Sequence, residues 1–266
     1  MIETIQKTFD DFVITARIKP AITAGFPLLL IVFYNGVVKS KWIEAGIGLA
    51  LSLVVISFAA YIVRELGKTY EEKSYKDFSS YVFPSSRTMK KHKDLGEMPT
   101  TIILRFNDDT VDNITKVKYH KWLNNKIPEL QLPLSKEQEN LDLQSDSKYK
   151  SAAIYLRTYA NSHKRFPRVY QELKKYNYWR NLYGCKWYAL LLYVILAIRE
   201  ILMIDRFNVA EMFLKPIPRY TMLIVLVIWS IVFCWIVTKR TVKRSAFDYA
   251  KTLLETIDAM DFDFEA

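Results

Sequence analysis

The chain has 266 residues, of which 51% are hydrophobic, and it carries a formal net charge of +10. This length accommodates one small membrane domain and one soluble domain of about 120 residues, which excludes a large multidomain enzyme. The excess of Lys and Arg favours an anionic partner.

The first 19 residues place Ile2, Ile5, Phe9 and Ala16 at helical spacing, with charged residues between them. This pattern predicts an amphipathic helix over residues 1–19. The helix could lie on a bilayer surface or cover part of a soluble core. No short apolar core with a cleavage site occurs here, so we do not expect a cleaved signal peptide.

Long uncharged runs then mark the membrane segments. Three of them are 19 residues long, which at 1.5 Å per helical residue approaches the roughly 30 Å of a bilayer core. They cover residues 20–38, 45–63 and 220–238. A fourth candidate, residues 187–204, contains Arg199 and Glu200. The sequence therefore predicts four transmembrane helices in two hairpins, residues 20–63 and residues 187–238.

Between the hairpins, residues 64–186 form a long polar insert. From residue 65 to residue 186 it contains 23 Lys and Arg against 15 Asp and Glu. Basic residues also flank the inner ends of the predicted spans, and by the positive-inside rule the insert and both termini are cytoplasmic. We expect an inner-membrane protein with a cytoplasmic tail over residues 239–266. Cys185 and Cys234 would then face a reducing compartment without forming a disulfide.

The insert is predicted to be mainly α with a minor β element. Residues 100–106 are β-branched and apolar and precede turn-forming residues, which favours a strand. Ser135 is a candidate cap in the loop over residues 128–143. The predicted helices cover residues 64–81, 110–126, 146–162, 167–183 and, beyond the last span, 245–260.

Catalysis has little support, and we expect no enzyme activity, cofactor or metal. The chain lacks a Gly-rich phosphate loop, a nucleophile elbow and paired zinc ligands. Asp108, Asp109 and Asp112 form a DDxxD pattern that could hold Mg²⁺. At the start of a helix these residues favour capping instead, with Asp109 as the cap and Asp112 at the positive end of the helix.

Basic and aromatic residues gather in the insert, and they predict a nucleic-acid-binding surface. Cations neutralise phosphates, aromatic faces stack on unpaired bases, and amides can read base edges. The alternative is that the aromatic residues are core residues and the cations neutralise lipid head groups. The candidate contacts are Arg105, Lys116, Tyr119, His120, Lys121, Arg157, Arg165, Arg168, Trp179, Arg180 and Asn181.

The charges of the third span predict a pore or gating site. Arg199 and Glu200 are costly in lipid and should face a bundle interior or a water path, or snorkel to the interface. Adjacent helical residues point about 100° apart, so we expect Arg199 to pair with Glu44 or with Glu200 of another copy.

A resemblance adds to this interpretation. The segments Pro99-Thr100-Thr101, Leu104-Arg105, Tyr119-His120, Leu156-Arg157 and Tyr178 to Gly184 are similar to a recurring pattern in bacterial membrane proteins with two hairpins around an insert. In layout and charge the chain resembles the four-span effectors of bacterial anti-phage defence, among them the Hailong-system channel effector. That resemblance implies a homo-oligomer, with a tetramer favoured, and a nucleotidyltransferase encoded nearby. It also implies short single-stranded DNA or a related oligonucleotide as the ligand.

We therefore expect a ligand-gated channel of the bacterial inner membrane whose insert binds an oligonucleotide. One alternative is a non-channel scaffold or sensor that binds a protein partner or anionic lipid. Another is a metal-dependent enzyme acting on lipid through the three aspartates.

Overall fold

The structure is a computed structural model that describes the backbone of residues 10–38, 42–74, 97–160, 165–204 and 219–262. Side chains are described for residues 10–32, 55, 57–74, 97–160, 165–202 and 221–259. The chain divides into two compact units. Unit 1 comprises residues 1–70 and 177–241, and unit 2 comprises residues 71–176 and 242–266. These divisions fall inside three helices, α4 (Trp42–Ser74), α9 (Pro167–Gly184) and α12 (Lys239–Leu254).

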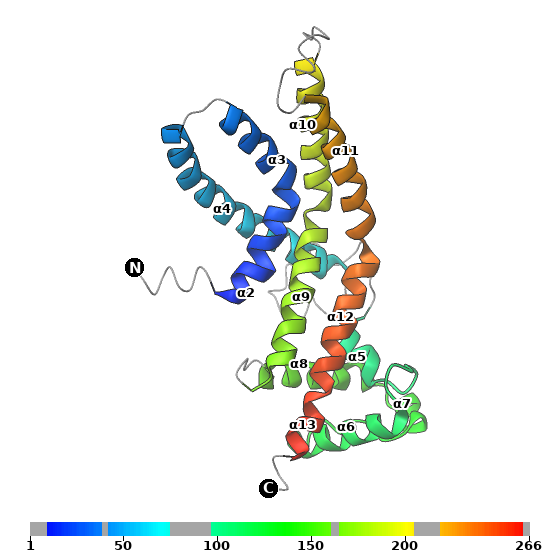
Figure 1. Cartoon of the computed structure of the whole chain (residues 1–266). Helices are drawn as coiled ribbons and strands as arrows, with labels where there is room; N and C mark the ends of the chain where they lie inside the picture. The colour runs from blue at the N-terminus through cyan, green and yellow to red at the C-terminus, as the bar shows by residue number, and fades with distance from the viewer. Residues whose placement is uncertain (1–9, 39–41, 75–96, 161–164, 205–218, 263–266) are drawn as a thin grey trace. The chain divides into compact units, whose positions relative to one another are not determined.

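The regular secondary structure in the described residues of unit 1 is helical (Figure 1). Helix α2 (Asp11–Val13) continues through a π-helical turn, η1 (Ile14–Ile18), into α3 (Lys19–Val38), and α4 covers Trp42–Ser74. Helix α9 (Pro167–Gly184) is followed by α10 (Lys186–Ile204), and α11 covers Arg219–Ile236. Helices α10 and α11 pack side by side, and α3 contacts both. Their shared core includes Ala24, Tyr193, Leu226 and Phe233.

Helices α4 and α9 approach closely at two glycines of unit 1. A Cβ atom on Gly184 would lie 2.6 Å from the Cα of Gly67, and one on Gly67 would lie 2.7 Å from the Cα of Asn181. Real side chains do not tolerate such distances, so this crossing requires glycine on both helices. Small residues permit the same close approach between membrane helices.

The predicted spans coincide with helices, but the four-span arrangement is not confirmed. Among the described residues, Asp11–Val32 is long and apolar enough to cross a membrane, with a mean hydropathy of 1.3. The pair Thr221–Ile236 and Lys239–Ala259, which is bent by 47°, passes the same criterion together. This gives one or two candidate spans. Core helices of soluble proteins can share these properties, so length and hydropathy alone do not decide the topology.

Unit 2 is a separate helical bundle with its own core. It contains α5 (Pro99–Leu104), α6 (Asn113–Lys126), α7 (Lys136–Leu141), α8 (Ser145–Tyr159) and α13 (Thr256–Phe262). It also holds the beginning of α9 and most of α12 (Lys239–Leu254). Leu104, Leu123, Tyr149 and Leu156 meet Leu253 in the core, so the C-terminal segment is an integral part of this unit.

The predicted strand over residues 100–106 is wrong, because Pro99–Leu104 form helix α5 and the described residues of unit 2 contain no strand. Pro99 occupies the first turn, where its missing N–H costs nothing and its fixed φ suits a helix. The Thr101 hydroxyl donates to the Met98 carbonyl at 2.7 Å. Ile103 and Leu104 are buried in the core. Tertiary burial thus outweighs the β propensity of this apolar run.

One of the two predicted helix caps is confirmed and the other is not. Ser135 caps α7, its hydroxyl accepting from the Gln138 N–H at 3.3 Å. The cap of α6 is Asp112, whose carboxylate accepts from the Thr115 N–H at 2.9 Å. The prediction that Asp109 caps this helix is therefore wrong, because α6 begins at Asn113, three residues later than expected.

Candidate functional site

Two of the predicted nucleic-acid contacts, Lys116 and His120, are fully buried in unit 2. The Lys116 ammonium donates to the Arg105 carbonyl at 2.7 Å and to the Asp108 carbonyl. Burial lowers its pKa, an effect that the nearby carboxylates of Asp108 and Asp109 oppose. In this conformation the amino group ties the loop after α5 to helix α6, and it has no surface to offer a ligand.

His120 contacts a backbone carbonyl on each side. Its Nδ1 lies 2.5 Å from the Pro133 carbonyl oxygen, and its Nε2 lies 2.9 Å from that of Leu104. Burial lowers the pKa of the ring, although the two carbonyls favour its protonation. The imidazole therefore joins α6 to α5 and to the loop before α7, which is a structural role.

Tyr119 and its neighbour Lys118 connect α6 to α13. The Tyr119 hydroxyl donates to Asp258 at 2.8 Å, and the Lys118 ammonium lies 2.9 Å from the other oxygen of that carboxylate. Burial raises the pKa of Tyr119, and the hydrogen bond to Asp258 acts in the same direction. With only 3% of its surface exposed, Tyr119 cannot stack on a base in this conformation.

Two of the predicted arginines are held by carboxylates. Arg105 lies 2.7 Å from Asp146 and 3.1 Å from Glu97. Arg168 lies 3.2 Å from Glu255, yet its side chain is 77% exposed. Exposed ion pairs of this kind are worth little, so the Arg168 guanidinium can exchange its partner for a ligand phosphate at small cost.

Arg157 and Lys121 have different surroundings. Arg157 is half-buried in the last turn of α8 and interacts electrostatically with Tyr249. Lys121 is exposed on α6. Of these two candidates, Lys121 is the more exposed residue.

Arg165 belongs to a group of aromatic rings and cations that we call the aromatic–cation surface. Its guanidinium lies 5.6 Å from the Tyr159 ring centroid and 5.5 Å from that of Phe166. The Lys126 ammonium lies 5.6 Å from the Trp122 ring centroid, and Trp122 is 6.3 Å from Tyr159. The surface comprises the exposed cations Lys126 and Arg165, the half-buried rings of Tyr155 and Tyr159, and the buried rings of Trp122 and Phe166, which are each 8% exposed. Of its members, sequence reasoning proposed only Arg165 as a contact, although the spacing of four between Trp122 and Lys126, and between Tyr155 and Tyr159, places each pair on one helix face.

The remaining three predicted contacts lie in unit 1. Asn181 is 1% exposed, donates to the Ala16 carbonyl at 2.6 Å, and accepts from Arg180 at 3.1 and 3.2 Å. Trp179 is half-buried and packs edge-on against Tyr178, with ring centroids 5.0 Å apart. These side chains stabilise the crossing of η1, α4 and α9.

Arg199 donates directly to the adjacent Glu200, which the 100° separation of neighbouring helical positions did not lead us to expect, and the pairing with Glu44 or with Glu200 of another copy stays a prediction. The flexible arginine side chain spans the angle between neighbouring helical positions. Glu200 is buried at 6% side-chain exposure, whereas that of Arg199 is 40%. The side chain of Glu44 lies outside the described ones.

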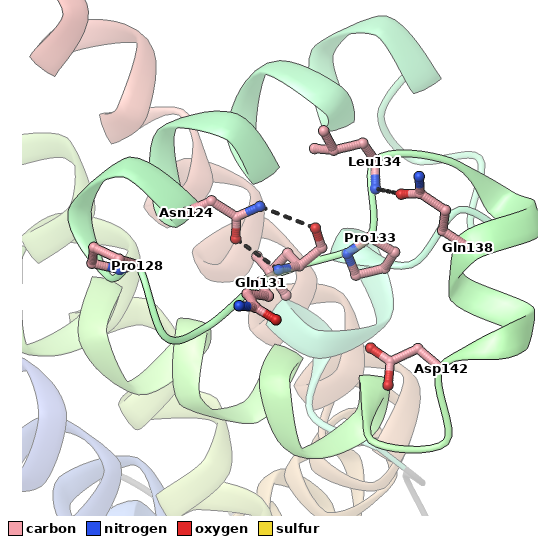
Figure 2. Close-up of a pocket in the computed structure, with 8 residues that line it drawn as sticks. Asn124, Pro128, Gln131, Pro133, Leu134, Gln138 and Asp142 are labelled. Carbon is pink, nitrogen blue, oxygen red and sulfur yellow. Dashed lines mark hydrogen bonds between the residues drawn. The ribbon is translucent and has the colours of Figure 1, made fainter.

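A pocket of about 370 Å³ opens between the end of α6, the following loop and α7 (Figure 2). The Asn124 side-chain oxygen accepts a hydrogen bond from the Leu132 N–H at 2.7 Å, and the Asn124 amide nitrogen donates to the Leu132 carbonyl at 3.0 Å. Gln138 accepts from the Leu134 N–H at 2.8 Å. These polar groups hold the loop itself, so the pocket offers few of them to a ligand.

The DDxxD pattern does not gather into a metal centre in the part of the chain that the structure describes, where no group of three or more metal-ligating side chains occurs. Asp112 caps α6, and Asp108 accepts from the Thr110 N–H at 3.0 Å.

Comparisons of the chain with protein-family models, curated proteins and solved structures find no match. The resemblance to defence effectors therefore stays a prediction.

Proposed function

We propose that this chain is a multi-pass membrane protein in which unit 1 lies in the bilayer. The observation that carries the proposal is the two-sided apolar character of α10. Ala189, Tyr193 and Leu196 line its buried face, and the opposite face exposes more than half of each of several apolar side chains. This exposed face consists of Trp187, Leu191, Val194, Ile195, Ile198, Ile201 and Leu202.

Helix α11 repeats this pattern. Met222, Leu226 and Phe233 are buried, and the opposite face exposes Ile224, Ile228, Ile231 and Trp235. A surface helix in water carries polar residues on its outer face, whereas a helix that is apolar all round needs protein or lipid on every side. Lipid around the α10–α11 hairpin would cover the exposed apolar faces of both helices.

We further propose that the protein is a homo-oligomeric channel of the bacterial inner membrane, controlled by an anionic oligonucleotide such as short single-stranded DNA. The Arg199–Glu200 pair supports the channel, because charges in an apolar helix are retained where they face a bundle interior or a water path. The exposed side of Arg199 suits such a path, and Glu200 neutralises it.

The aromatic–cation surface supports the ligand class. Tyr155 and Tyr159 are half-buried, which leaves part of each ring exposed beside Lys126 and Arg165. Aromatic rings stack on bases and adjacent cations neutralise phosphates, each stacked base being worth about 1–3 kcal/mol. Lys121 and Arg168 add exposed positive charge to the same unit.

A flux assay on reconstituted liposomes tests this function. We expect ion flux that changes when short single-stranded DNA is added, and a variant with Lys126→Gln and Arg165→Gln that loses the response. A matched variant with Lys136→Gln and Lys251→Gln removes two other exposed cations and should keep the response. Absence of flux with and without DNA would contradict the channel proposal. An equal loss of the DNA response in both variants would contradict the proposal that the aromatic–cation surface binds the DNA.

A second candidate is a membrane scaffold whose unit 2 binds a protein partner. It is favoured by the internal pairing of several cations, because Arg105, Lys118 and Lys148 each have a carboxylate within 3 Å. A purified sample without absorbance from copurified nucleic acid, together with a monomeric particle in detergent, would favour the scaffold over the channel.

A further inference from the structure

One end of the α10–α11 hairpin is closed by a lysine. Lys186, the first residue of α10, donates to the Val237 carbonyl at 2.7 Å and to the Cys234 carbonyl at 3.1 Å. The last carbonyls of a helix lack partners within it, so the ammonium caps the end of α11. These bonds also fix the geometry, because they place the beginning of α10 beside the end of α11.

Three large amphipathic rings are exposed at this end of the hairpin. Trp187 is 72% exposed, Tyr188 is 63% exposed and Trp235 is 81% exposed. Each combines an apolar ring with an N–H or O–H group, and such rings favour the boundary between lipid tails and headgroups. Their positions beside Lys186 and Cys234 put all three at the same level of the hairpin.

Exposed cations follow directly. After α11 the chain bends by 47°, and α12 begins with Lys239 and Arg240, both exposed. The Thr238 hydroxyl accepts from the Thr241 N–H at 3.2 Å and fixes this turn. Along the sequence no acidic residue occurs between Lys239 and Asp248, so the first nine residues of α12 contain four basic residues and no acidic one.

We propose that this end of the hairpin binds the headgroups of anionic phospholipids. Trp187, Tyr188 and Trp235 lie at the boundary with the acyl chains, and Lys239 and Arg240 contact lipid phosphates in the layer above them. The bend after Ile236 is then the point where the chain leaves the bilayer. This inference rests on the proposed membrane placement of unit 1 and adds a selectivity for lipid charge that the placement does not require.

Tryptophan quenching in vesicles tests the proposal on the full chain. The probe is a minor fraction of brominated lipid, either phosphatidylglycerol or phosphatidylcholine, in otherwise identical vesicles. We expect brominated phosphatidylglycerol to quench more strongly, because each surface cation enriches an anionic lipid roughly five-fold at low salt. Lys239→Gln with Arg240→Gln should abolish the difference, and Trp187→Phe with Trp235→Phe should remove most of the selective quenching.

Two controls separate the possible failures. Exchanging the cations, Lys239→Arg with Arg240→Lys, and neutralising two exposed cations of unit 2, Lys121→Gln with Lys136→Gln, should both preserve the preference. Equal quenching of the native chain by the two lipids would overturn the headgroup site and leave the membrane placement intact. No quenching by either lipid would overturn the placement itself.

Discussion

Asp112 is the N-cap residue of α6 in unit 2, and its side chain stabilises the beginning of that helix. Replacing it with Ala removes the acceptor for the Thr115 N–H and should lower the thermal midpoint of unfolding. Asp109→Ala is the matched control and should change stability by much less. The measurement is the thermal unfolding of both variants in detergent, and equal losses would show that Asp112 is not the effective cap.

His120 gives unit 2 a dependence on pH. Burial lowers its pKa from the ordinary value of 6.5. As the pH falls through about 6.5, His120 becomes protonated in the unfolded state while it stays neutral in the folded state. The free energy of unfolding therefore decreases. His120→Gln should flatten this decrease between pH 7.5 and pH 5.5, whatever its effect on stability at pH 7.5. An unchanged pH profile in unfolding experiments would contradict the assignment.

For single residues, the sequence indicates which chemical groups are present but not which of them are buried. It identified the basic and aromatic composition of the insert, but it could not tell that Lys116 and His120 are buried while Lys121 is exposed. Helix α6 carries polar residues on all sides, so no apolar stripe indicates which face packs inward. The carbonyls that contact Lys116 and His120 come from the last residue of α5 and from loops, whose positions no local pattern predicts.

Among the elements, the crossing of α4 and α9 makes the sharpest prediction. Gly184→Ala would place a methyl group 2.6 Å from the Gly67 backbone, which cannot yield as a flexible side chain would. The helices must separate, and we expect a loss of about 1–3 kcal/mol. We expect the thermal midpoint of the Gly184→Ala variant, measured in detergent, to be lower than that of the native chain.

Gly25→Ala is the matched control for this change, because a Cβ atom there has nothing within 4 Å. It should leave the midpoint unchanged or raise it slightly, since alanine favours helix over glycine. Equal midpoints for the two variants would contradict the tight crossing.

The helices themselves were largely predictable from local signals. Uncharged runs located α3, the first part of α4 and α11, and Pro167 with Gly184 marked the two ends of α9. Helix α5 was not, because its apolar β-branched residues carry the local signature of a strand, and only the core around Ile103 and Leu104 makes them helical. The direct pairing of Arg199 with Glu200 was missed for a related reason, since helix geometry alone ignores the reach of a long side chain.

At the level of the whole molecule, the two units differ in what their surfaces require. Unit 1 exposes continuous apolar faces on α10 and α11, whereas unit 2 surrounds a closed core with ion pairs such as Lys118–Asp258 and Lys148–Asp142. Composition anticipated this contrast. The number of spans could not be derived in the same way, because it depends on which helices meet lipid and which meet protein.

Thiol labelling in membrane vesicles tests the placement of unit 1 most directly. In a chain with Cys185 and Cys234 replaced by alanine, a cysteine is introduced at Ile228, which is 55% exposed on α11, or at Lys121 on α6. Thiolate formation requires water, so a lipid-covered cysteine should not react with a water-soluble maleimide. We predict rapid labelling at position 121 in open vesicles and labelling at position 228 only after denaturation. Equal rates at the two positions before denaturation would contradict the membrane placement on which the account depends.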